Sequence, residues 1–568
     1  MSFSEQTELR YSAATRKIDL LPYVVGLLTI FVLFVFMIYP ILKTTMASFV
    51  ENGQELALSN LTLVNFKKFL EGATFTKALW HSIMVGILTS VVSAALALPA
   101  AYAVARVSIP FRNFILALMV IPIIAPPFIG AYSWITLLGR RGIITHFLDS
   151  WFGIEMPSLY GLFGIVVALS LHYFPYIFLF VQGALAASDP YIEESAHLMG
   201  ARRSWIIRTI TLPLVLPTIA AGTLIVLAKA LGNFGVPAIL GGEYYVLPTL
   251  IYYQIHGFFN LNAASAIALV NVLITLMAIL LLGWINRKRR FITITSVTRR
   301  SKQHTGLGAQ ILANCYIWLL LLFALLPQIV IVFSSFAERW GGSLLPTQYG
   351  FANYLTVWEE TSRPIFNSLI LASAATLMCV VFGSLAAYTS VRRKFFGKWA
   401  LDLTIMLPFI IPGIVTGVAF LTTFNTGPLV LAGTAMIIVL AYFTRRIAYI
   451  FRSVSASIAQ VDNKMEEAST ICGASWGWTV RKVTVPLIAP GILAGSILVF
   501  STLITEMSVT IILYSARWKT ISISIFEQLT NDDVLEASTV GAIAIVMTLI
   551  LVFSAAKLIG KSMSDMFR

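Results

Sequence analysis

Four polar side chains recur at a fixed spacing within two long apolar segments. Lys229 and Asn233 lie four positions apart in one segment, and Thr502 and Glu506 lie four positions apart in the other. Residues at i and i+4 share one face of a helix, so each pair is predicted to present its polar groups together. A charged side chain within a membrane is costly and indicates a functional role. The available chemistry is attraction between an ammonium and a carboxylate, or oxygen ligation of a hard cation by Glu506.

Two adjacent arginines, Arg445 and Arg446, interrupt a further apolar segment. One interpretation directs their guanidinium groups toward a wet cavity or an inner mouth, where they pair with carbonyl or carboxylate oxygens. The other places them outside the bilayer, on a helix that enters the membrane later than its apolar run suggests. The sequence pattern leaves both interpretations open.

A polar passage that occurs twice is the most specific pattern in the chain. Its copies lie 273 positions apart (466 minus 193), and the register holds without a gap through Trp205 and Trp478. An internal repeat of this length sets the architecture. The copies read Glu193-Glu194-Ser195-Ala196-His197-Leu198-Met199-Gly200-Ala201 and Glu466-Glu467-Ala468-Ser469-Thr470-Ile471-Cys472-Gly473-Ala474.

Each copy is predicted to form a short helix, a turn and a second helical stretch along the membrane surface. Asp189 and Asp462 precede the copies, and Asp is a favoured N-cap. The paired glutamates then lie near the helix N-terminus, where negative charge suits the helix dipole. Gly200 and Gly473 can end the helix, because glycine tolerates positive φ. Two aligned copies indicate a docking element rather than an ordinary charged loop.

The composition places these features in a membrane protein. Of 568 residues, 58% are hydrophobic and 11% are charged, whereas soluble domains carry about 25% charged residues. Runs of about 18 or more apolar residues indicate spanning helices. The net charge of +14 is explained by Lys and Arg in cytoplasmic loops rather than by a nucleic-acid partner. An all-α polytopic protein with about twelve transmembrane helices is expected, at residues 20–42, 78–105, 113–138, 159–187, 209–240, 263–286, 311–335, 365–391, 399–424, 429–456, 484–513 and 537–560.

The spans divide six and six, so the two halves run in the same direction, related by a pseudo-two-fold axis along the membrane normal. Upstream of the repeated passages the offset is 286, as between Arg106 and Arg392, so the first half carries 13 extra residues (286 minus 273) near 139–157, where a surface loop is expected. The Lys and Arg bias places the passages and both termini in the cytoplasm. The expected divisions are a first half at 1–286 with its passage near 189–208, a basic cytoplasmic linker beside anionic lipid at 287–308, and a second half at 309–568 with its passage near 462–481.

The repeated passages resemble the E-A-A-x-x-x-G signature of type I, binding-protein-dependent ABC-importer permeases. Each copy departs from it at one position, where Ser195 or Ser469 replaces an alanine by another small residue. The resemblance covers both halves and implies the type I ABC-importer fold. It also implies that each passage is a coupling helix that docks in a groove of a cytoplasmic ATPase subunit. The residues that it assigns to ATPase coupling are Glu193, Glu194, Ala196, Gly200, Glu466, Glu467, Ala468 and Gly473.

The fusion of two halves in one chain resembles the ferric-iron permease group. The stretches at 233–241 and 506–510 also look like that group. Similar permeases serve aminoethylphosphonate, thiamine, polyamines and sulfate, so those substrates remain alternatives. The resemblance implies two copies of an ABC ATPase that carry ATP and Mg, a periplasmic or extracellular substrate-binding protein, and a location in the bacterial inner membrane. It implies no cofactor on this chain.

In such permeases the helices that carry Lys229 and Glu506 line the central path. One hypothesis is that these two side chains face each other near the two-fold axis and hold a gate closed. A second is that Glu506 offers a ligand to passing ferric iron, with Lys229 as a neighbouring modulator. A third is that each residue bonds within its own half.

Two other functional classes fit the sequence less well. An ion-coupled secondary transporter would need no doubled coupling passage, and few carboxylates lie within the spans. A membrane enzyme lacks candidate catalytic residues. The only near match to a phosphate-binding G-x-x-x-x-G-K-S/T loop is Gly560-Lys561-Ser562, but Ala555 stands at the first glycine position. We therefore expect that the chain does not hydrolyse ATP.

Overall fold

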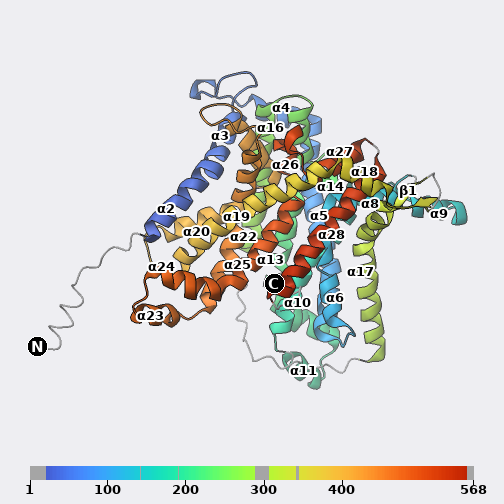
Figure 1. Ribbon diagram of the computed structural model, residues 1–568. Helices are drawn as coiled ribbons and strands as arrows, with labels where there is room; N and C mark the ends of the chain where they lie inside the picture. Colours follow the sequence, from blue (N-terminus) through green and yellow to red (C-terminus); the bar gives the residue numbers. More distant parts are fainter. Residues whose placement is uncertain are drawn as a thin grey trace, which may run out of the picture.

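The computed structural model describes residues 21–140, 142–189, 191–287, 306–340, 345–531 and 533–559 (Figure 1). Most of these residues are helical, and long helices run between two ends of the molecule. The expected linker falls largely outside the described residues, as does Gly560-Lys561-Ser562.

The first half begins with a helix that continues through a π-helical turn. The elements are α2 (Leu21–Leu33), η1 (Phe34–Ile38), α3 (Tyr39–Ser48), η2 (Leu58–Asn60), α4 (Val64–Glu71), α5 (Ala73–Arg106), α6 (Arg112–Leu118), α7 (Ile121–Ile124), α8 (Pro127–Leu138), α9 (Ile143–Phe152), α10 (Leu162–Ala187), α11 (Tyr191–Leu198), α12 (Arg203–Ile206), η3 (Ile207–Thr211), α13 (Leu212–Leu231), α14 (Gly235–Leu240), α15 (Leu247–His256) and α16 (Leu261–Arg287).

The second half repeats this order and adds one small antiparallel strand pair. Its elements are α17 (Leu307–Ser335), β1 (Ala337–Arg339), β2 (Gln348–Tyr349), α18 (Ala352–Glu360), α19 (Ser362–Arg392), α20 (Lys398–Met406), η4 (Leu407–Phe409), α21 (Gly413–Phe424), α22 (Ala435–Gln460), α23 (Lys464–Ile471), α24 (Trp476–Thr479), η5 (Val480–Thr484), α25 (Val485–Ile504), α26 (Thr510–Leu513), η6 (Ala516–Trp518), α27 (Ile521–Thr530) and α28 (Val534–Ile559).

The sequence repeat is also a structural repeat. Helices α10 to α13 and α22 to α25 begin and end at residues that differ by 273, the offset of the repeated passages, and the π-helical turns η3 and η5 obey the same rule. Helices α8 and α21 differ by 286 at both ends. The two halves therefore run in the same direction, as the even number of spans predicts.

The 13 extra residues of the first half contain the short helix α9. It has no buried residue, and Phe147, Trp151 and Phe152 are exposed on it. The expected surface loop is therefore a surface helix. Its exposed aromatic side chains suit the boundary between membrane and water.

Nine helices among the described residues are long and apolar enough to cross a membrane, and a bent pair makes a tenth. That pair corresponds to the expected third span, which prolines divide into α6, α7 and α8. The expected ninth span is divided likewise at Pro408 and Pro412 into α20, η4 and α21. A proline lacks the N–H of a helical ladder, so these prolines break the helix instead of bending it. The expected tenth span is the single helix α22, which carries Arg445 and Arg446.

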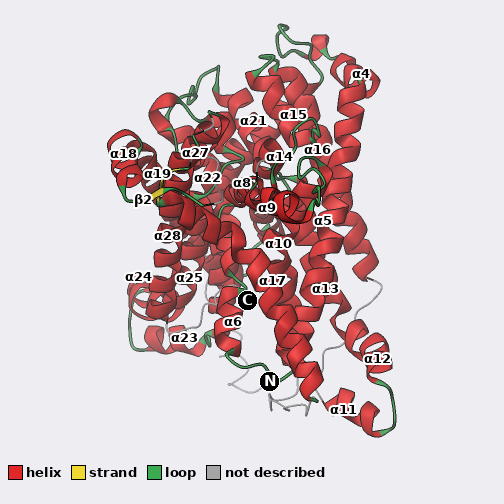
Figure 2. Ribbon diagram, turned by 90° about the vertical axis from the view of Figure 1, so that its right-hand side faces the viewer, coloured by secondary structure: helices red, strands yellow, loops and turns green. Residues whose placement is uncertain are grey.

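The first helix of each half packs against the other half as well as its own. Helices α2 and α3 pack against α19, α20 and α21, while α17 packs against α5 and α8 (Figure 1, Figure 2). Hydrogen bonds fix both contacts: Lys43 Nζ donates to the Thr423 carbonyl at 3.3 Å, and Ser133 Oγ donates to the Pro327 carbonyl at 2.8 Å. The two halves are therefore interlocked rather than side by side.

Candidate functional site

Both repeated passages fold into the same element at one end of the molecule. We call residues 191–206 (α11 and α12) the first coupling element and residues 464–479 (α23 and α24) the second. Both lie at the lower end in Figure 1 and stand apart from each other in Figure 2. Because the halves are parallel, the two elements face the same side of the membrane.

The turn inside each coupling element has the expected glycine geometry. Gly200 has φ of 86° and Gly473 has φ of 84°. In the first element the N–H of Ala201 donates to the carbonyl of Ala196 at 3.1 Å, and the N–H of Gly200 donates to the carbonyl of His197 at 2.9 Å. The second element repeats both bonds, and together they form a Schellman motif that satisfies the last helical carbonyls.

The start of each coupling element differs slightly from the expectation. Asp189 Oδ1 accepts from the backbone N–H of Tyr191 at 2.9 Å, and Asp462 Oδ1 accepts from that of Lys464 at 3.0 Å. In the second element Asp462 precedes the N-cap Asn463 by one residue, and in both elements the aspartate accepts from the N–H two residues on, as in an Asx turn.

The first glutamate of each passage joins its coupling element to a long helix. Glu193 is 4% exposed, and its carboxylate accepts from Arg106 at the end of α5, at 3.1 Å. Arg106 also donates to Ser188 Oγ at 2.7 Å and to the Leu185 carbonyl at 2.9 Å. This buried arginine thus binds the coupling helix and the end of α10 together, with its charge paired as burial requires.

The second half repeats this link in a more open form. Arg392, the last residue of α19, lies 3.3 Å from Glu466, and the Tyr388 hydroxyl donates to the same carboxylate at 3.0 Å. The side chains of Arg392 and Glu466 are 9% and 17% exposed, against 6% and 5% for Arg106 and Glu193. The second link is therefore the more hydrated of the two.

The second glutamate of each passage and the helix tips face outward. Glu194 and Glu467 are exposed, as are Ala468 and the two turn glycines, while Ala196 is half-buried. Apolar side chains at the tips are strongly exposed, with Met199 at 88% and Ile471 at 86%. Each coupling element therefore has a buried root and a free, partly apolar outer face.

A buried polar cluster lies at the far ends of the helices that leave the coupling elements. Glu506 follows the end of α25 and is 8% exposed. Arg445 Nη1 donates to its Oε1 at 3.0 Å, and Arg446 Nη2 donates to its Oε2 at 2.5 Å. Both carboxylate oxygens are therefore held by arginines of α22 in the same half.

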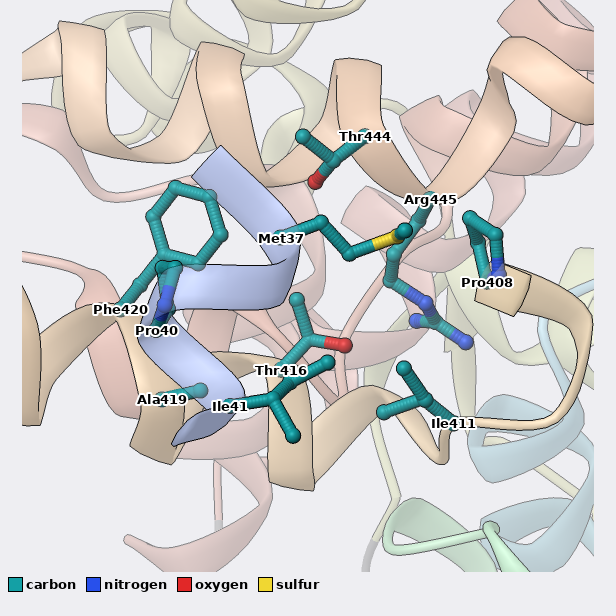
Figure 3. A pocket seen from close by; sticks show the side chains of 10 residues that line it. All are labelled: Met37, Pro40, Ile41, Pro408, Ile411, Thr416, Ala419, Phe420, Thr444 and Arg445. Carbon is teal, nitrogen blue, oxygen red and sulfur yellow. The ribbon is translucent and has the colours of Figure 1, made fainter. Parts of the chain in front are cut away.

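Arg445 reaches Glu506 past a glycine. A Cβ at Gly413 would lie 2.4 Å from Arg445 Nη1 and 2.8 Å from Cβ of Ser508, so an added side chain would displace one or both of these groups. Figure 3 shows the side chain of Arg445 beside Ile411 and beside Met37 of the first helix. The Arg445 side chain therefore occupies a narrow space that is left open because residue 413 is glycine.

The first half holds neutral groups at the equivalent positions. Asn233 Nδ2 donates to the Tyr173 hydroxyl at 2.9 Å, and these residues align with Glu506 and Arg446. Lys229 Nζ lies over the ring of Tyr176, 5.0 Å from its centroid, which is a cation–π contact. Lys229 is also close enough to Tyr449 and Arg446 of the other half to interact with them electrostatically.

The two halves touch immediately beyond this cluster. A Cβ at Gly232 would lie 3.2 Å from Cβ of Pro412, and one at Gly235 would lie 3.0 Å from Sδ of Met507. The rings of Phe234 and Phe526 have centroids 5.9 Å apart. The cluster therefore lies at a point where the two halves meet.

Comparison with known proteins decides the family. The sequence family described as the binding-protein-dependent transport system inner membrane component matches the chain twice, at residues 86–291 and 379–565. The chain belongs to this family.

Relatives of this permease extend over both of its halves. The ferric transport system permease protein FbpB of Actinobacillus pleuropneumoniae is 29% identical over 94% of the chain and 78% of its own length. A putative ferric transport system permease protein of Haemophilus influenzae is 31% identical over 86% of the chain and 77% of its own length. A putative 2-aminoethylphosphonate permease of Salmonella typhi is 29% identical over 41% of the chain and 89% of its own length. The chain is therefore a fused, two-half, multi-pass ABC permease of the inner membrane.

Lys229 and Glu506 do not form an ion pair in this permease, although Lys229 is close enough to act electrostatically on Glu506. Within the described residues Lys229 has no carboxylate within ion-pair distance, and Glu506 is bound by Arg445 and Arg446. The two i,i+4 pairs also do not share helix faces as expected, because α13 ends at Leu231 and α25 at Ile504. Asn233 and Glu506 therefore lie beyond the helices that carry Lys229 and Thr502. Thr502 donates to the backbone carbonyl of Val499 at 2.9 Å instead.

The arginine pair lies inside the permease and not at a membrane entrance. Helix α22 runs unbroken from Ala435 to Gln460, and both guanidinium groups bind a buried carboxylate. Their expected pairing with a carboxylate is therefore present. Both Glu506 oxygens are occupied, and no cluster of three His, Cys, Asp or Glu side chains occurs among the described residues. A role for Glu506 as a cation ligand would require both ion pairs to break.

The arginines at the roots of the coupling elements were not identified as functional from the sequence. Arg106 and Arg392 align at the offset of 286, which marked the repeat, but their partners Glu193 and Glu466 align at 273. Two cations and two carboxylates that repeat together are a usable signal. The change of offset between them obscured it.

Proposed function

We propose that this chain is the permease subunit of an ATP-driven importer that moves its substrate by alternating access. The observation that carries the proposal is the pair of coupling elements. Their helices begin and end at equivalent residues, lie at one end of the molecule, and combine a buried root with an exposed face. A secondary transporter has no use for two such elements.

Each coupling element is connected to the central cluster by a short route. The Glu193–Arg106 link joins α11 to α5, and the π-helical turn η3 joins α12 to α13. Helix α13 then carries Lys229 close to the other half. A displacement of the coupling element by an ATPase therefore moves the helix that ends at the cluster. The π-helical turn η3 lies on this route where α12 passes into α13, and such turns are frequent at functional sites.

The partners follow from this arrangement. Two copies of a cytoplasmic ABC ATPase dock on the coupling elements and hold the ATP and Mg, while this chain binds neither. A periplasmic substrate-binding protein delivers cargo to the opposite end. Both termini of the permease then lie in the cytoplasm.

Ferric iron is the proposed substrate. It is supported by two relatives that carry the name of ferric transport permeases and match most of the chain. Aminoethylphosphonate is the second candidate, but the relative of that name matches only 41% of the chain.

The test is uptake by the assembled transporter in cells that lack other iron importers. The chain is co-expressed with candidate ATPase and binding-protein subunits from its own organism, and uptake of radioactive iron is measured. Glu194→Lys and Glu467→Lys should abolish uptake and ATPase co-purification, because both residues are on the outer face of the coupling elements. Glu55→Lys, an exposed charge reversal at the opposite end, is the matched control for ATPase co-purification. ATPase binding that survives both coupling variants would refute the docking role.

A further inference from the structure

The central cluster has an excess of positive charge. Lys229, Arg445 and Arg446 contribute three cations, and Glu506 is the one carboxylate that pairs with them among the described residues. The sum is a net charge of +2. Burying charge without full compensation is costly, so an excess at the meeting point of two halves indicates that a further charged species visits it.

Lys229 and the phenols of Tyr176 and Tyr449 are more exposed than Glu506, whereas Arg446 is buried at 9% exposed. Lys229, Tyr176 and Tyr449 are half-buried, so part of each side chain can be reached by solvent. Glu506 is 8% exposed and is covered by its arginines. A molecule between the halves therefore meets an ammonium and tyrosine hydroxyls, all of which can donate hydrogen bonds.

The half-buried groups Lys229, Tyr176 and Tyr449 come from both halves, and the buried Arg446 lies beside Tyr449. Lys229 lies over Tyr176 of its own half, and Arg446 lies over Tyr449 of the other half, 5.6 Å from its centroid. Tyr176 and Tyr449 are equivalent positions of the repeat (offset 273). Lys229 also interacts with Tyr449 and Arg446. We call Lys229, Tyr176, Tyr449 and Arg446 the axial group.

Lys229 and Arg446 thus lie near one another from opposite halves, and Glu506, which is bound to Arg446 and Arg445, leaves a net positive charge on the cluster. Like charges repel, and in a site poor in water that repulsion is little screened. An anion between Lys229 and Arg446 would relieve it, whereas a second cation would add to it. The arrangement therefore favours a negatively charged visitor.

We propose that the axial group is a transient binding site for an anionic cargo. The cargo is an oxyanion, or a metal ion still wrapped in enough anionic oxygen ligands to carry net negative charge. The inference rests on the proposed function, because it takes the axial group to line the import path. If the imported metal is ferric iron, it passes this point as an anionic complex and not as a bare cation.

Binding to the purified permease tests the site directly. The full-length chain in phosphatidylcholine nanodiscs is titrated with radiolabelled citrate, with ferric citrate in excess citrate, and with radiolabelled spermidine as a cationic probe. Both anionic probes should bind and spermidine should not. Binding should weaken as salt is added, because a charge-assisted contact is screened.

Variants of opposite sign separate the site from general surface charge. Lys229→Thr copies the residue of the second half and should weaken citrate binding by about tenfold or more, the loss of one charge-assisted contact. Thr502→Lys adds a cation at the equivalent position and should strengthen it. Lys229→Arg retains the charge and should rescue binding. Lys77→Thr removes an exposed cation at the outer end of α5 and should leave binding unchanged.

The outcomes distinguish this inference from the proposed function. Absence of anion binding, equal binding of spermidine, or equal loss in Lys229→Thr and Lys77→Thr would overturn the anionic site. Failure of iron uptake by the assembled transporter, with anion binding intact, would overturn ferric iron as the substrate and leave the site standing. A Lys229→Thr variant that does not fold is replaced by the Thr502→Lys gain, whose absence likewise counts against the site.

Discussion

Asn233 and Tyr173 form a 2.9 Å neutral hydrogen bond at the positions where the other half has the ion pair of Glu506 and Arg446. The backbone frame is shared, since α10 and α22 have equivalent bounds, and so have α13 and α25. One frame therefore supports either an amide with a phenol or a carboxylate with a guanidinium. The two halves therefore differ in charge at equivalent positions, with a neutral pair in the first half and an ion pair in the second.

The buried carboxylate should be important for stability. Glu506→Asn leaves Arg445 and Arg446 without a counter-charge and should lower the free energy of unfolding by about 3–5 kcal/mol. Adding Arg446→Tyr recreates the pair of the first half and should recover part of the loss. Thermal unfolding of the single and double variants in one detergent measures the coupling between the sites. Purely additive losses would show that the two positions do not act as a pair.

Gly413 is expected to be intolerant of any side chain. Gly413→Ala places a Cβ 2.4 Å from Arg445 Nη1, and the displaced guanidinium should cost about 1–3 kcal/mol of stability. Gly130→Ala is the matched control, because its Cβ meets only Pro327 at 3.6 Å, an ordinary contact. Unfolding temperatures of the two variants provide the comparison. If Gly413→Ala and the control unfold at the same temperature, the position of Arg445 does not depend on the space beside Gly413.

Most features of the fold were predicted from the internal repeat. Its register located the coupling elements, the parallel halves and the extra segment near α9, because equivalent sequences fold into equivalent helices. The packing of each first helix against the other half could not be predicted in this way. An apolar helix such as α2 or α17 shows in its hydropathy that it enters a membrane, but not which neighbours it packs against.

The central cluster was predicted in its members but not in its pairing. Lys229, Arg445, Arg446 and Glu506 were identified because charge within an apolar segment is costly. The choice of partner depended on where α13 and α25 end. Helix ends are the least certain part of a sequence-based prediction. The expected spans 209–240 and 484–513 end nine residues beyond α13 and α25 (240 minus 231, 513 minus 504). Glu506, two residues past the end of α25, was therefore placed on the helix and assigned to the wrong cation.

The tips of the coupling elements should bind the ATPase without contributing to folding. Met199→Asp and Ile471→Asp replace side chains that are 88% and 86% exposed, so each should change stability by no more than about 0.5 kcal/mol. Each should nevertheless reduce ATPase co-purification, since an apolar contact with the docking groove is replaced by a charge. Loss of stability comparable to that of a core variant would instead show that the tips pack within the permease.

The two root links should differ in their importance. Glu193→Gln removes the charge from the more buried pair and leaves Arg106 uncompensated, whereas Glu466→Gln does the same at a site that is more open to water. Both should raise ATP hydrolysis that is not coupled to uptake, and the first should do so more strongly, because solvent can replace the lost partner of Arg392 but not that of Arg106. The ratio of ATP hydrolysed to substrate imported, measured in proteoliposomes with the complete transporter, gives the comparison.

Arg106→Lys retains the charge but cannot make the forked contacts to Glu193 and Ser188, so it should resemble Glu193→Gln and not the unmodified chain. A normal coupling ratio in Arg106→Lys would mean that charge alone, and not the geometry of the guanidinium, holds the coupling helix to α5.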